Sequence, residues 1–137
     1  MVRRSRGAAA LEFVLILPFL LLLMAGMVDG ALFFSNAQRA LLAASAGARA
    51  GATTEEQSPI DGSEIVNAAT QAATDQLNRG AVVPALHSVR VEWLDRGGHT
   101  YVIVTVEVES QRLFPSLTPF PDRVSRRVAM MTVEQLP

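Results

Sequence analysis

The chain has 137 residues, of which half are hydrophobic and only 18% are charged, with a formal net charge of −1 and a mean hydropathy of +0.27. This charge argues against a nucleic-acid partner, because domains that bind nucleic acid are usually basic. The chain has no cysteine and all its basic residues are arginine, which excludes disulfides, thiol nucleophiles, zinc–thiolate sites and lysine chemistry. We therefore expect no metal and no cofactor.

The N-terminal region contains a long apolar run behind a cluster of arginines. Arg3, Arg4 and Arg6 precede the run from Phe13 to Phe34, whose only charge is Asp29. At about 1.5 Å per residue the run can cross a bilayer core of about 30 Å, and it is longer than the apolar part of a typical secretory signal. Because the arginines lie on one side, the positive-inside rule predicts a cytoplasmic N-terminus and an exported C-terminal part.

A few residues interrupt the apolar pattern. Glu12 fits either the headgroup level, where the helix dipole favours it, or a paired role, since a carboxylate in a membrane helix is costly. Pro18 predicts a kink in the helix, either harmless or a bent segment that favours helix packing. Gly26 and Gly30 form a G-x-x-x-G step that lets two helices approach closely. Asp29 is expected to reach the exported interface or to make a polar contact with another protein.

Small residues continue the helical pattern beyond the apolar run. Residues 35–52 are rich in alanine, the best helix former, so we expect one helix over residues 8–52 that includes a membrane span at about 13–34. Ala43, Gly47 and Gly51 repeat every four residues on one face. This face is expected to pack against the chain's own head, or against neighbouring helices of other chains.

The remainder, residues 53–137, predicts a small α+β head. Apolar residues at helical spacing predict a second helix over residues 62–79, with Asp61 and Glu64 as a capping box. The pattern then alternates, which predicts strands over 87–95, 100–110 and 123–134 in an antiparallel sheet, the first two joined by a Gly-Gly hairpin turn.

Between the second and third strands, residues 111–122 contain three prolines and cannot form a central strand. Phe114, Leu117 and Phe120 of this loop are expected to pack on the head or to contact a partner.

A catalytic site is not expected. His87 and His99 stand before a strand and in a turn, and no serine-nucleophile, phosphate-loop or zinc-protease motif is present. Glu107 and Glu109 alternate with buried valines and fit a solvated strand face.

The N-terminal pattern resembles the TadE-like proteins, minor pilins or pseudopilins of the Tad (Flp) branch of type IV pili. Arginines precede the segment Gly7-Ala8-Ala9-Ala10-Leu11-Glu12-Phe13. The further positions that carry the resemblance are, in order, Pro18, Gly26, Asp29, Gln38, Ala44 and Ala48-Arg49. The resemblance implies that residues 1–7 are a leader, which a prepilin peptidase removes by cutting between Gly7 and Ala8. It also implies that Glu12 pairs with the N-terminal amine of a neighbouring subunit. In such a fibre the bend at Pro18 would help subunits pack, the small-residue face would meet neighbouring helices, and Asp29 would contact another subunit or the assembly platform.

The resemblance further implies the partners and location of the chain. The partners would be major and minor pilins, the prepilin peptidase, the inner-membrane assembly platform and membrane lipid. The chain would be a single-pass inner-membrane protein with its head outside, and would reach the cell surface in a pilus. The alternative is an uncleaved, membrane-anchored assembly or scaffold protein of the same machinery. An anchored receptor ranks last, because seven cytoplasmic residues offer no output region.

Overall fold

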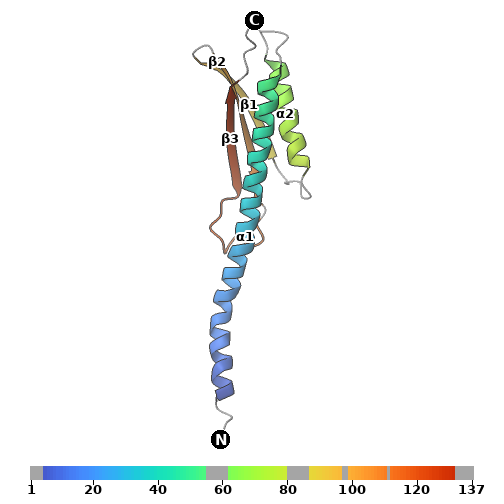
Figure 1. Ribbon diagram of the computed structural model, residues 1–137. Helices are drawn as coiled ribbons and strands as arrows, with labels where there is room; N and C mark the ends of the chain where they lie inside the picture. Colours follow the sequence, from blue (N-terminus) through green and yellow to red (C-terminus); the bar gives the residue numbers. More distant parts are fainter. Residues whose placement is uncertain (1–4, 55–61, 80–86, 97–98, 111, 132–137) are drawn as a thin grey trace.

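The computed structural model describes residues 5–54, 62–79, 87–96, 99–110 and 112–131. The expected α+β fold is confirmed: one long N-terminal helix and one short helix cover the same face of a three-stranded antiparallel sheet (Figure 1). The elements are α1 (Ser5–Thr53), α2 (Ser63–Asn78), β1 (His87–Arg96), β2 (His99–Glu109) and β3 (Arg123–Met131).

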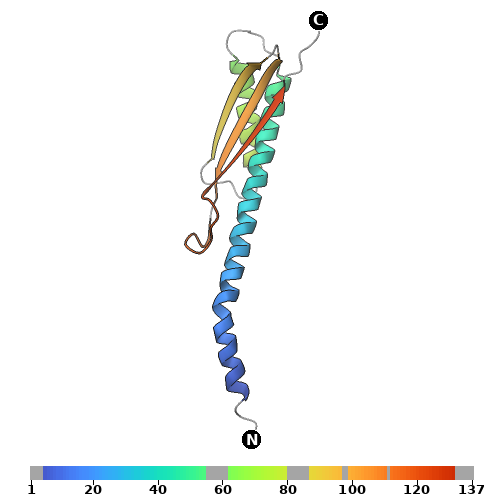
Figure 2. The same cartoon turned by 90° about the vertical axis from the view of Figure 1, so that its left-hand side faces the viewer.

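Helix α1 has two halves with different surroundings. Every side chain from Ala9 to Met24 is exposed, whereas from Ala25 onward one face of the helix is buried. The helix continues on both sides of Pro18. Figure 2 shows the C-terminal half lying along the sheet and the N-terminal half projecting beyond it.

The sheet has the order β1-β2-β3, so the hairpin strands pair and the third strand returns beside β2, as expected. Arg96 pairs with His99, which fits a two-residue connection, although Gly97 and Gly98 lie outside the described residues. The alternating valines of β2 face the helices and are buried: Val102, Val104, Val106 and Val108.

The small residues of α1 allow a close approach to the head. A Cβ atom at Gly47 would lie 2.7 Å from the carbonyl oxygen of Ala69 in α2, and one at Gly51 would lie 2.8 Å from Val102 Cγ1 in β2. The neighbouring alanines of α1 are fully buried: Ala40, Ala43, Ala44 and Ala48. The small-residue face therefore packs on the chain's own head, the first of the two expected possibilities.

Helix α2 begins after a glycine. Gly62 is the N-cap, with φ of 53°, and its side-chain position faces Trp93 of β1 at 3.3 Å. Asp61 lies outside the described residues, so the capping box expected between Asp61 and Glu64 stays a prediction. Glycine meets both demands because it adopts positive φ without strain and leaves room for the indole ring.

Candidate functional site

The most unusual feature of the molecule is the proline-containing loop between β2 and β3, residues 112–122, here called the docking loop. It runs from the end of the sheet toward the N-terminal half of α1 (Figures 1 and 2). Its base is closed where the Ser110 N–H donates to the carbonyl of Asp122 at 2.7 Å. Within it, the N–H groups of Leu117 and Thr118 donate to the carbonyl of Phe114 at 3.0 and 3.3 Å, so the loop forms a compact turn.

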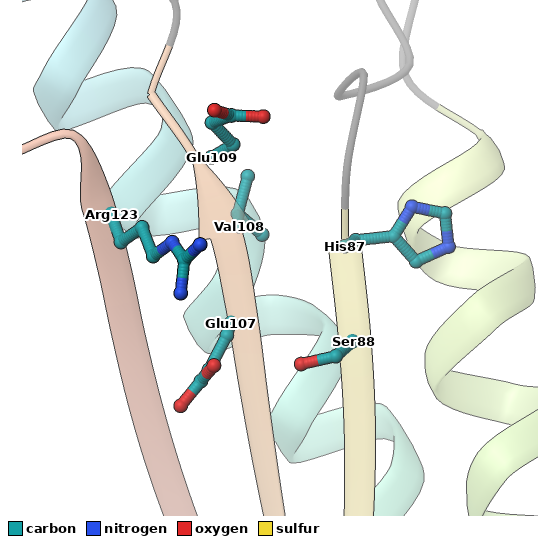
Figure 3. Close-up of a pocket in the computed structure, with 6 residues that line it drawn as sticks. All are labelled: His87, Ser88, Glu107, Val108, Glu109 and Arg123. Carbon is teal, nitrogen blue, oxygen red and sulfur yellow. The ribbon is translucent and has the colours of Figure 1, made fainter.

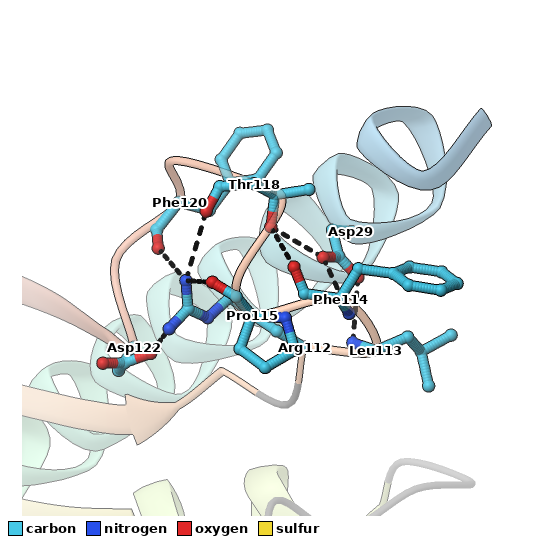
Figure 4. Close-up of polar contacts among 8 residues, drawn as sticks. All are labelled: Asp29, Arg112, Leu113, Phe114, Pro115, Thr118, Phe120 and Asp122. Carbon is cyan, nitrogen blue, oxygen red and sulfur yellow. Dashed lines mark hydrogen bonds and ion pairs between the residues drawn. The ribbon is translucent and has the colours of Figure 1, made fainter. Parts of the chain in front are cut away.

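Asp29 of α1 holds the tip of the docking loop (Figure 4). Its carboxylate is completely buried and accepts three hydrogen bonds, from the N–H of Leu113 at 2.9 Å, the N–H of Phe114 at 3.2 Å and the hydroxyl of Thr118 at 2.7 Å. A buried carboxylate is tolerated only where such donors replace water. The polar group expected to reach the interface or another protein therefore has its partners within the chain.

Arg112 organises the loop from its other side. Its guanidinium donates to the carbonyl oxygens of Pro115 at 3.3 Å, Thr118 at 3.3 Å and Phe120 at 2.9 Å, and also pairs with the Asp122 carboxylate. The guanidinium offers five donors in a rigid plane, so one side chain can collect carbonyls that the loop turns inward. Asp29 thus accepts hydrogen bonds from N–H groups of the loop, and Arg112 donates to carbonyl groups of the same loop.

An aromatic contact completes the junction. The ring of Phe120 stacks on Phe33 of α1, with centroids 5.5 Å apart and an interplanar angle of 23°. A Cβ atom at Gly30 would lie 3.3 Å from the Phe120 ring, whereas one at Gly26 would meet nothing within 4 Å. In this chain the close approach at Gly30 is made by the docking loop.

The matched glycines give a testable consequence. Gly30→Val should push the Phe120 ring away and open the docking loop, because overpacking typically costs about 1–3 kcal/mol. Trypsin cleavage after Arg112 in the detergent-solubilised protein should then rise about 5- to 100-fold, relative to cleavage after the exposed Arg79. Gly26→Val carries the same helix-propensity cost and should leave the rate unchanged. Equal effects of the two variants would contradict the contact.

Below the junction, the docking loop and α1 line one apolar groove. Its volume is about 540 Å³. Phe114 and Leu117 line it from the loop and remain 41% and 55% exposed. The lining from α1 consists of Pro18, Leu21, Leu22, Met24, Ala25 and Val28.

Six of the ten predicted site residues lie in two places where the docking loop meets α1. Asp29, Gly30 and Phe120 lie together at the junction, while Phe114 and Leu117 lie with Pro18 at the groove. Away from the junction, Gly7 and the side chain of Glu12 are exposed and Gly26 is half-buried. Ala8 lies in α1, and its side chain is outside the described part of the chain.

Sequence reasoning missed Arg112, Thr118 and Phe33 as parts of the junction. The available signal was the single carboxylate in an apolar run together with a loop rich in prolines, but neither feature specifies the other.

A second depression lies at the end of the sheet and has a volume of about 220 Å³. Figure 3 shows Ser88, Glu107 and Arg123 on its outer face, with the His87 ring turned toward the other side. The register explains this, because His87 pairs with the inward-facing Val108 and Ser88 pairs with Glu107. The sheet separates the imidazole from the carboxylates, so these residues do not form an acid–base pair. Across the described ranges, no three His, Asp or Glu side chains are placed to hold a metal ion.

Comparison with known proteins identifies the N-terminal segment. Residues 7–49 match the family model described as TadE-like protein, and they include Asp29, Gly30 and Phe33 but none of the docking loop. No curated protein and no solved structure matches the chain. The match confirms the resemblance seen in the N-terminal residues and supports, through that segment, a TadE-like protein of the Tad pilus system.

Proposed function

We propose that the chain is a minor pilin or pseudopilin of a Tad-type apparatus, cleaved after Gly7 and assembled through α1 into the pilus or at its tip. Its role is structural, with no catalytic turnover. Its partners are major and minor pilins, the prepilin peptidase and the inner-membrane assembly platform. Before assembly it is a single-pass membrane protein with a cytoplasmic N-terminus and its head outside.

The observation that carries this proposal is the exposed apolar surface of the first half of α1. Phe13, Phe19 and Leu21 are 60%, 71% and 57% exposed, and the helix between Ala9 and Met24 is apolar on all sides except at Glu12. A helix of this kind is stable in a membrane or within a bundle of similar helices. The TadE-like match over residues 7–49 gives this surface its context in the Tad pilus system.

Glu12 supports assembly through the same surface. It is the only acidic side chain before Asp29, and it stands exposed among apolar neighbours. In a bundle of helices its carboxylate needs a cation, since an unpaired charge in an apolar interior is strongly destabilising. Cleavage after Gly7 creates an ammonium group at Ala8, which a neighbouring copy of such a helix can present.

The first experiment is to determine the N-terminal residue of the protein from membranes and from the sheared surface fraction of its host. A start at Ala8, with protein in the sheared fraction, supports a processed pilin. A start at Met1 or Val2, with all protein in the membrane, overturns it and leaves the uncleaved assembly or scaffold protein.

The role of Glu12 predicts a specific defect. Glu12→Gln keeps the size of the side chain and removes its charge, so loss of a buried ion pair should lower recovery in the sheared fraction at least about tenfold. Total protein, measured by immunoblot, should stay unchanged. Glu107→Gln, which removes a charge from the outer face of the sheet, is the control. Normal recovery of the Glu12 variant would show that assembly does not use this carboxylate.

A further inference from the structure

We propose that the tip of the docking loop inserts into the bilayer leaflet nearest the head, so that the chain contacts lipid through two separate segments. The inference rests on α1 crossing the membrane, as in the proposed function. The loop's partner would be the acyl chains of that leaflet.

The position of the loop along α1 is the first argument. Asp29, to which the loop is bound, lies five residues before Phe34, the end of the apolar run. At 1.5 Å per residue this is about 7 Å inside the run. Phe114 and Leu117 share a groove with Leu21 and Ala25, which lie still farther from that end. When α1 spans a bilayer, the loop tip is therefore at the depth of the apolar segment.

The surface of the loop suits that depth. Leu113, Phe114 and Leu117 are 63%, 41% and 55% exposed, and residues 113–121 contain no charged side chain. The two charges that flank this stretch, Arg112 and Asp122, pair with each other at the base of the loop. Exposed apolar side chains at the tip and an ion pair at the base are the distribution expected for a segment at the membrane–water interface.

Several polar backbone groups of the loop also have partners within the protein. Irregular backbone at membrane depth is tolerated only where its polar groups are satisfied by protein. Three of the residues are prolines, which have no N–H to satisfy. Asp29 and the Phe114 carbonyl each accept two backbone N–H groups, and Arg112 takes three carbonyls.

At this depth the loop and α1 satisfy each other's polar groups. A carboxylate in the hydrocarbon region of a bilayer costs several kcal/mol unless it is paired or covered. The docking loop covers Asp29 completely and supplies three donors. The carboxylate in turn satisfies two N–H groups that would otherwise enter the leaflet without partners.

The absence of cysteine permits a direct test with single labels. Leu117→Cys carries an environment-sensitive fluorophore, in phosphatidylcholine nanodiscs that hold one copy each. Phe19→Cys in α1 and Leu94→Cys in β1 are references, and all three residues are exposed. Lipids with a spin label near the headgroup or deep in the acyl chain serve as quenchers. Slow trypsin cleavage after Arg112 shows that the labelled loop stays docked, and Leu113→Cys replaces Leu117→Cys if it does not.

We expect the label at position 117 to lose most of its intensity with the shallow quencher, position 19 to lose most with the deep quencher, and position 94 to lose little with either. Quenching at 19 without quenching at 117 would overturn the inference and leave the proposed function intact. No quenching at 19 would overturn both. If the label at position 117 leaves water only when a disc holds two copies of the protein, the loop contacts protein. That result would overturn the lipid contact.

Discussion

Asp29→Ala should release the docking loop from α1 and increase trypsin cleavage after Arg112 about 100-fold. The substitution removes three hydrogen bonds, and bonds to a charged acceptor contribute about 1.5–3 kcal/mol each. It also leaves the N–H groups of Leu113 and Phe114 without their acceptor. Because such contributions are not additive, we take about 3 kcal/mol for the whole contact, which corresponds to about two orders of magnitude.

The matched control is Asp75→Ala on the exposed face of α2, which should leave cleavage after Arg112 unchanged. Asp29→Asn retains one acceptor oxygen and should give an intermediate rate. If Asp29→Ala and Asp75→Ala behave alike, the loop is held by its own internal bonds and the carboxylate does not position it.

Gly47→Leu is expected to have the largest effect on the stability of the head. The side chain would have to enter the space between α1 and α2, where even a Cβ atom lies 2.7 Å from the Ala69 carbonyl oxygen and 3.0 Å from the Ala73 Cβ. Backbone atoms cannot rotate away, so the helices must separate. We expect a loss of about 3 kcal/mol, the upper end for overpacking, seen as a fall of about 10 °C in the thermal midpoint in detergent.

Gly26→Leu provides the control for this prediction, because a Cβ atom at Gly26 meets nothing within 4 Å. It should leave the thermal midpoint, followed by circular dichroism, within about 2 °C of the original protein. An unchanged midpoint for Gly47→Leu would mean that α1 and α2 are not closely packed at this point.

The sequence predicts most of the fold because periodicity and burial are linked. Buried valines at every second position set one face of β2, and alanine and glycine at every fourth position set the face of α1. The Gly-Gly pair predicts a hairpin, and the strands on either side of it pair. Each of these signals lies within a single element, so it can be read locally. The contact between Gly62 and Trp93 could not, because Trp93 lies on a strand that is distant in the sequence.

The docking of the loop was beyond such reasoning. Asp29 and its three donors are separated by 84 to 89 residues, and no periodic pattern connects them. A lone carboxylate in an apolar run is equally consistent with an interface or a partner contact. Arg112 gives no signal either, because its role is to collect carbonyl oxygens, which every residue has.

The docking loop also determines how the molecule can bend. From Asp29 to Thr53, α1 packs against the loop, α2 and the sheet, so we expect this part of the helix to move together with the head. The stretch around Pro18 has one fewer backbone hydrogen bond than an ordinary helix and is N-terminal to Asp29. We therefore expect a sideways force on the head to bend α1 near Pro18, where the proline removes one backbone hydrogen bond.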